Sequence, residues 1–169
     1  MQKLWSPWRS KYIDSFKNEN KDNTCVFCSA KSKNFKEDDK SLVVYRGKNS
    51  FIMMNLYPYN NGHMMIIPFR HICDYTELTS EELNEITDLN KHLIKALTNI
   101  MQPHGFNFGA NIGKAAGAGI DTHLHFHLVP RWNGDTNFMP VLGEVKIISQ
   151  DLLDTKNKII SELEKFKLK

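Results

Sequence analysis

Apolar residues recur at spacings of three and four along residues 80–101, the longest such pattern in the chain: Leu83, Ile86, Leu89, Leu93, Leu97 and Ile100. This spacing places them on one face of an α-helix. Thr79, with Glu82 three residues later, has the form of a capping box, and Pro103 forbids continuation of the helix. The pattern therefore predicts a helix over 80–101 with one buried face.

Shorter apolar segments bounded by turn residues predict strands over residues 42–46, 51–55, 63–68, 106–112 and the histidine-rich stretch 123–127. Pro58 and the turn dipeptide Asn61-Gly62 mark the connection between the second and third of them. A weaker amphipathic pattern over 152–166 predicts a second helix. These elements favour the α+β class, with an antiparallel sheet of about five strands and the long helix packed on one face.

The length of 169 residues is typical of one domain, which we place over residues 1–169. Residues 1–24 form a tryptophan-containing leader expected to pack on the body or on a partner subunit. The core is expected over 25–155, and 156–169 form the end of the C-terminal helix. Residues 29–41 are polar and charged, which predicts an exposed loop.

The charge balance excludes some classes of partner. The 22 basic and 19 acidic residues give a net charge of +3, too mild to indicate binding of a nucleic-acid polymer, although it would suit a small anionic ligand. No apolar run has the length of a membrane span, and the N-terminus has no signal-peptide core. We therefore expect a cytoplasmic protein without a membrane partner.

Three histidines, His123, His125 and His127, alternate with apolar residues. Read as a strand, they share one face, and the apolar residues between them can pack on the core. An imidazole can be a nucleophile, a general acid or base, or a metal ligand. The outer two lie about 13 Å apart at ~3.3 Å per residue, so one metal cannot hold all three. The alternative is a polar strand face, but seven histidines in 169 residues do not readily place three in register by chance.

Cys25 and Cys28 have the Cys-x-x-Cys spacing of half a zinc site. Two reduced buried cysteines or a redox pair are the alternatives, and the third cysteine, Cys73, stands alone. An odd number of cysteines also argues against a disulfide framework. On the spacing alone, these alternatives stay open.

Two further segments can recognise a nucleotide. The stretch 113–119 (Gly-Lys-Ala-Ala-Gly-Ala-Gly) is not a Walker A motif, but its small residues let backbone amides approach an anion. Asn55 ends a predicted strand, and Tyr57 and Tyr59 follow it; these side chains can contact a ribose or a base. A flexible connection and a surface turn are the alternatives.

Together these residues resemble the histidine triad family, whose signature alternates three histidines with apolar residues and is matched at every position from His123 to Val129. Residues 55–60, 113–119, 130–132 and 134–139 resemble the fragile-histidine-triad branch and bacterial enzymes that split diadenosine tetraphosphate. The resemblance covers about residues 25–155. It implies the HIT-like fold, a homodimer, and nucleotidyl transfer that cleaves dinucleoside polyphosphates.

The resemblance also implies a role for each site residue. His125 is the nucleophile, which forms a nucleotidyl-imidazole intermediate, His127 binds phosphate oxygens, and His123 and His63 complete the catalytic group. The nucleotide is bound by Asn55 at the ribose and by Asn111, Gly117, Ala118 and Gly119 at the phosphates. Zinc-containing members and the related galactose-1-phosphate uridylyltransferases imply a structural zinc held by Cys25, Cys28, His71 and His123.

One departure from the family leaves the reaction open. The fragile-histidine-triad hydrolases carry a glutamine in the loop before the triad, and residues 116–120 contain none. The second acceptor is therefore either water or inorganic phosphate. A nucleoside phosphoramidate hydrolase, and a zinc-stabilised nucleotide-binding protein that signals without chemistry, are the alternative functions.

Overall fold

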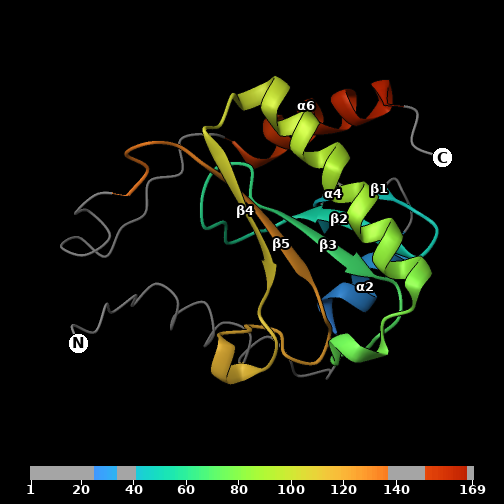
Figure 1. Ribbon diagram of the computed structural model, residues 1–169. Helices are drawn as coiled ribbons and strands as arrows, with labels where there is room; N and C mark the ends of the chain where they lie inside the picture. The colour runs from blue at the N-terminus through green and yellow to red at the C-terminus, as the bar shows by residue number, and fades with distance from the viewer. Residues whose placement is uncertain (1–24, 34–40, 137–150, 167–169) are drawn as a thin grey trace, which may run out of the picture.

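The computed structural model describes residues 25–33, 41–136 and 151–166 (Figure 1). The predicted leader, residues 1–24, lies outside the described residues, and the domain boundaries stay predictions. A five-stranded sheet contains β1 (Val43–Arg46), β2 (Ser50–Met54), β3 (Met64–Pro68), β4 (Gly105–Ala110) and β5 (Phe126–Arg131). The strand order is β1-β2-β3-β5-β4 and every neighbouring pair is antiparallel. The predicted α+β architecture is thereby confirmed.

The long helix α4 (Ser80–Met101) begins and ends where the sequence predicts. The Thr79 side chain accepts a hydrogen bond from the Glu82 amide, and the Glu82 carboxylate accepts one from the Thr79 amide. At the other end Gln102 adopts a left-handed conformation with φ 49° before Pro103. The C-terminal helix α6 (Leu152–Lys165) begins at Asp151, whose carboxylate caps two amides. No helix within the described residues has the length and apolarity needed to cross a membrane.

Both faces of the sheet are packed. Helices α4 and α6 lie together over one face (Figure 1), where they bury the alternate apolar residues of the strands, among them Ile52, Met54, Ile66 and Leu128. The short helix α2 (Val26–Ser32) covers part of the other face through Phe27 and Ala30, which contact Val43, Phe51 and Ile67. The part of that second face that α2 does not cover, along β4 and β5, is where the candidate site forms.

The structure corrects three predicted segments by more than one residue. Residues 29–32, predicted as an exposed loop, belong to α2, because Phe27 and Ala30 bury the inner side of this otherwise polar helix. Strand β4 covers residues 105–110 instead of 106–112. Strand β5 begins at Phe126, so His123 and His125 precede it. The chain there leaves the ladder with β3 because the Leu124 amide donates to the Ile72 carbonyl, beyond the end of β3.

Candidate active site

The three alternating histidines have three different environments, although the residues between them pack as predicted. Leu124, Phe126 and Leu128 are buried in the core under α4. The rings of His125 and His127 lie next to each other, with centroids 4.8 Å apart. The ring of His123 lies instead beside that of His71, at 4.8 Å. The three histidines therefore lie in two separate groups, His123 with His71 and His125 with His127.

His123 is fully buried and belongs to a group of metal-donor atoms. Its Nε2–H donates to the Pro68 carbonyl at 3.0 Å, which leaves the lone pair of Nδ1 directed at Cys25 Sγ (3.3 Å) and Cys28 Sγ (3.7 Å). His71 Nδ1 lies 3.2 Å from Cys28 Sγ. Burial lowers the pKa of His123 to about 4, so the imidazole is neutral at physiological pH, as a metal ligand must be.

The four donors Cys25, Cys28, His71 and His123 fit a tetrahedral metal site. All four donor atoms lie within 4.8 Å of one another. A zinc ion with bonds of about 2.0 Å to nitrogen and about 2.3 Å to sulfur holds tetrahedral ligands about 3.4–3.8 Å apart, close to the sulfur–nitrogen distances found here. Helix α2 brings the two cysteines together, because Cys25 is the residue just before its first turn and Cys28 lies in that turn. This group can hold a metal ion, and it joins α2 to the segment before β5.

His125 is held in the form that a nucleophile requires. Its Nδ1–H donates to the backbone carbonyl of His123 at 2.9 Å, so the lone pair of the neutral ring is on Nε2. The side chain is 5% exposed and packs against Phe27, with ring centroids 4.9 Å apart. Burial lowers the pKa of His125 below its ordinary value, which keeps the ring neutral and its lone pair available at neutral pH.

His63 and His127 have the opposite tautomer to His125, with the proton on Nε2, and a backbone amide sets this tautomer. The Tyr59 amide donates to His63 Nδ1 at 3.0 Å, so the proton of neutral His63 is on Nε2. His63 Nε2 lies 2.9 Å from His127 Nδ1, which must then accept. The remaining nitrogen of neutral His127, Nε2, therefore carries a proton. The site thus pairs a histidine that offers a lone pair with a histidine that offers a proton.

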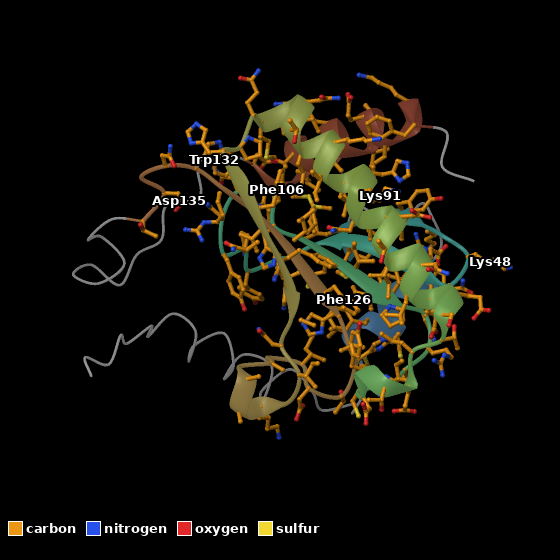
Figure 2. All side chains as sticks on the ribbon, viewed as in Figure 1. Lys48, Lys91, Phe106, Phe126, Trp132 and Asp135 are labelled. Carbon is orange, nitrogen blue, oxygen red and sulfur yellow. The ribbon has the colours of Figure 1, made fainter. Side chains whose placement is uncertain are left out.

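A cavity of about 450 Å³ opens beside His127 on the face of the sheet that α2 leaves uncovered. Its lining comes from the β2–β3 connection, from β4 and the residues after it, and from β5 and the residues after it: Tyr59, Asn60, Asn107–Asn111, His127, Val129, Arg131, Asp135 and Thr136. Figure 2 shows Asp135 and Trp132 past the end of β5, at the opposite end of this strand from Phe126. The cavity reaches the histidines through His127, since His125 is not part of its lining.

The predicted nucleotide-binding residues are found in different places. Asn111 lines the cavity. Asn55 is buried, and its Oδ1 accepts a hydrogen bond from the Tyr57 amide at 2.9 Å. In the loop before the triad, the Gly117 amide donates to the Lys114 carbonyl and the Ala118 amide donates to the Gly113 carbonyl, which shapes the short 3₁₀ helix η3 (Lys114–Ala116). The predicted ribose and phosphate contacts of Asn55 and of the loop, Gly119 included, stay predictions.

Sequence reasoning missed the polar network at the far end of the cavity. There Arg131 forms a two-pronged ion pair with Asp135, and Asn60 and Asn107 hydrogen-bond to the pair. The signal available in the sequence was the resemblance of residues 130–132 and 134–139 to one family branch. No periodicity predicts the contact, because it depends on the turn at Gly134, where φ is +80°.

Comparison with known proteins gives matches to one family. A family model described as the HIT domain matches residues 36–134. An AP-4-A phosphorylase from Mycobacterium tuberculosis is 38% identical over 167 residues, covering 96% of this chain and 84% of the relative. The adenosine 5'-monophosphoramidase HNT1 of Saccharomyces cerevisiae is 32% identical over 110 residues, covering 65% of this chain and 64% of the relative.

Solved structures give the same fold. A Zn-bound histidine triad family protein from Mycobacterium smegmatis matches with a TM-score of 0.66 at 23% identity, covering 85% of this chain and 96% of that chain. The diadenosine triphosphate hydrolase of Plasmodium falciparum matches with a TM-score of 0.60 at 21% identity, covering 93% of this chain and 97% of that chain. At these identities the likeness establishes the fold alone.

Proposed function

The chain belongs to the HIT domain family, and from this premise we propose that it cleaves dinucleoside polyphosphates by nucleotidyl transfer through His125. One observation carries the proposal: His125 presents a lone pair at Nε2 while neighbouring His127 presents a proton at Nε2. Attack on phosphorus needs the lone pair, and the N–H donor beside it stabilises the charge that develops on the departing oxygen. The AP-4-A phosphorylase of M. tuberculosis, 38% identical to this chain, supports this substrate class.

In the first step, the lone pair of His125 Nε2 attacks the α-phosphorus of the substrate. A phosphorus–nitrogen bond forms, and the bond from phosphorus to the bridging oxygen of the departing nucleotide breaks. His127 donates a hydrogen bond from Nε2–H to that oxygen, which departs as a phosphate anion with the electron pair of the broken bond, and His63 hydrogen-bonds the opposite nitrogen of His127. Splitting one displacement into two easier ones is the advantage of a covalent intermediate.

In the second step, an acceptor oxygen attacks the same phosphorus, and the electron pair of the phosphorus–nitrogen bond returns to His125. An anionic acceptor oxygen carries no proton, so His127 keeps its own and the starting state is restored. We assign inorganic phosphate as the acceptor, so that diadenosine tetraphosphate gives ATP and ADP. The small residues of the loop before the triad leave room for it, and the relative's name points the same way.

The nucleotide contacts follow the family resemblance. Asn55 would offer its amide nitrogen to the ribose, because its oxygen already accepts from the Tyr57 amide. Asn111 and the loop residues Gly117–Gly119 would hold the phosphates, with Asn111 positioned in the cavity lining. His123 acts by position, since its own backbone carbonyl fixes the tautomer of His125.

Zinc is the metal that we assign to the group of two cysteines and two histidines. Sulfur and nitrogen donors in a closed set of four are typical of a structural zinc site, and such an ion would tie helix α2 to the segment that carries His125. The buried Nε2–H···O=C bond from His123 to Pro68 is the outer-shell contact that usually orients a metal-binding histidine.

A homodimer is the expected assembly. Strand β4 lies at the edge of the sheet, and among the described residues no strand pairs with its outer side. Phe108 on that strand is 45% exposed and Ile112 just beyond it is 51% exposed. A second copy of the chain would cover this apolar edge.

A nucleoside phosphoramidate is the alternative substrate, favoured by the similarity to the monophosphoramidase HNT1. The same two histidines can serve that reaction, with ammonia or an amine as the protonated leaving group. The extent of the match favours the first function, because the phosphorylase matches 96% of this chain and HNT1 matches 65%.

Product analysis with diadenosine tetraphosphate tests the proposal. The protein is incubated with and without inorganic phosphate, beside the His125→Ala variant, and intact-mass measurement looks for the nucleotidyl adduct. We expect ADP and ATP only when phosphate is present, an adduct in the wild-type protein, and a fall in turnover of at least ~10⁴-fold in the variant. AMP and ATP without phosphate would identify water as the acceptor, and equal turnover in the variant would exclude His125 as the nucleophile.

A further inference from the structure

We propose that the far end of the cavity binds the distal phosphates of the departing nucleotide, with Arg131 and Asn107 as the contacts. This inference rests on the proposed nucleotidyl transfer, and it adds a specificity determinant for the length of the phosphate chain. It involves binding only, and no further covalent step.

Arg131 keeps donors available after its contacts with protein groups. Its Nε and Nη2 donate to the two oxygens of Asp135 at 2.6 and 2.8 Å, and its Nη1 donates to Asn107 Oδ1 at 2.8 Å. These bonds use three of the five guanidinium N–H groups. Among the described residues no partner is found for the other two, and the side chain is 42% exposed in the cavity wall.

The carboxylate of Asp135 is committed to the protein. Besides the two bonds from Arg131, it accepts from the Asn60 amide nitrogen at 2.9 Å and from the Trp132 backbone amide at 3.1 Å. Its side chain is only 9% exposed. Asp135 therefore fixes the guanidinium in place, and four donors from the protein occupy the acceptor sites that would otherwise face a ligand.

Asn107 is oriented by the same network. Because its Oδ1 accepts from Arg131, its Nδ2 carries the two N–H groups that remain for a ligand. Asn111, Tyr59 and Thr136 can each donate or accept, so they do not alter this balance. The groups that remain available at this end are thus N–H donors, since Asp135 balances the charge of Arg131 and its oxygens are already occupied, and such donors match a ligand made of phosphate oxygens.

The position of these donors selects the distal phosphates. Asn107 pairs with Val129, two residues along β5 from His127, which is about 6.6 Å at ~3.3 Å per residue. A single phosphate bound at His127 does not span this distance, whereas a chain of several phosphates does. Arg131 and Asn107 therefore contact groups that lie beyond the bond being broken.

Glycine keeps the path between the two ends open. Gly109 pairs with His127 across the sheet, and a Cβ built on it would meet nothing within 4 Å. Its backbone is an ordinary strand conformation, so no turn requires glycine there. Glycine inside a strand weakens it and often marks the close approach of a ligand. The absence of a side chain at this position leaves a channel from His127 to Asn107.

Asn107→Asp is the sharpest variant. Aspartate retains an oxygen for Arg131 Nη1, so the network persists, but two donors are replaced by a negative charge. Asn133→Asp is the matched control, because Asn133 is exposed near the same end of the sheet and does not line the cavity. Arg131→Gln removes the positive charge itself, and Arg131→Lys keeps the charge but lacks the planar guanidinium with its parallel N–H donors.

Two substrates separate a phosphate contact from a structural effect. Diadenosine tetraphosphate has a departing phosphate chain, whereas the p-nitrophenyl ester of AMP has none. We expect Asn107→Asp and Arg131→Gln to lower kcat/KM at least ten-fold for the first substrate and less than three-fold for the second. Asn133→Asp should change neither more than two-fold, and Arg131→Lys should recover part of the loss.

An equal loss with both substrates, or no loss with either, would overturn the subsite. If the wild-type protein cleaves neither substrate, the proposed function fails instead. In that case calorimetric binding of inorganic tripolyphosphate still tests the subsite. Binding that weakens at least ten-fold in Asn107→Asp, relative to Asn133→Asp, supports it, and unchanged binding overturns it.

Discussion

Replacing His63 should weaken the hydrogen bond that His127 donates to the departing oxygen while leaving the nucleophile intact. His63→Leu keeps a similar volume at a fully buried position but deletes the N–H that points at His127 Nδ1. An unpaired Nδ1 then competes for the proton, and the Nε2–H form of His127 loses its preference. His125 is unaffected in this respect, because the His123 carbonyl sets its tautomer.

The hydrogen bonds fix the size of the effect. Losing one neutral hydrogen bond, worth about 1–1.5 kcal/mol, shifts the tautomer ratio of His127 by roughly ten-fold. If the hydrogen bond to the departing oxygen is lost altogether, the penalty reaches the ~10²–10³-fold typical of losing one donor to a developing oxyanion. We therefore expect kcat for diadenosine tetraphosphate to fall between ten-fold and ~10³-fold. A nitrophenolate leaving group delocalises its charge into the ring and depends less on this hydrogen bond, so the p-nitrophenyl ester of AMP should react within about three-fold of the wild-type rate.

The assay is the ratio of kcat for these two substrates, measured in His63→Leu and in His63→Gln. Glutamine can accept from the Tyr59 amide and still donate to His127, so it should restore part of the ratio. An equal fall for both substrates would mean that His63 is only structural. An unchanged rate with diadenosine tetraphosphate would refute the assignment of His127 as the hydrogen-bond donor to the departing oxygen.

Three further predictions concern stability. Metal analysis should find one zinc per chain in the wild-type protein and none in Cys28→Ser or after treatment with a chelator. The melting temperature should fall in both cases, because free zinc at 1,000 times its Kd stabilises the folded state by about 4 kcal/mol. Arg70→Gln should destabilise the protein at neutral pH, because its hydrogen bonds hold the pKa of the Glu82 carboxyl below its usual value. That contribution is complete above about pH 4.3 and disappears as the pH falls through the folded pKa, so urea unfolding should show a smaller difference at pH 3 than at pH 7. Gly62→Ala should lower the melting temperature, since φ is +69° there and an added Cβ would lie 2.7 Å from Met101 Sδ; a melting temperature equal to wild type would contradict this.

Local sequence patterns predicted the elements whose formation does not depend on one particular packing partner. The 80–101 helix follows from its apolar stripe and capping box, and the strands near residues 43–46, 50–54 and 64–68 follow from short apolar runs. Helix α2 was missed because it is only seven residues long and two buried residues, Phe27 and Ala30, hold it against the sheet. The start of β5 was missed because it depends on where β3 ends.

The sequence predicted which histidines and cysteines form the site, but not how their side chains are oriented. The alternation of His123, His125 and His127 predicts that they divide their roles, but Pro68 decides that His123 turns its Nδ1 to the cysteines. His71 entered through the family resemblance, because nothing in its spacing marks it as a ligand. The contact of Arg131 with Asp135 depends on a turn and on Asn60 from another connection, so only the folded chain reveals it.

The donor that orients His63 and His127 is the backbone amide of residue 59. Every amino acid except proline supplies this N–H group. The nitrogen from which His127 donates its hydrogen bond therefore does not depend on which side chain occupies position 59. The tyrosine ring, which lies 4.6 Å from His63 and forms part of the cavity wall, is therefore free to change during evolution. Relatives can diverge in what they bind at this wall while inheriting the same chemistry.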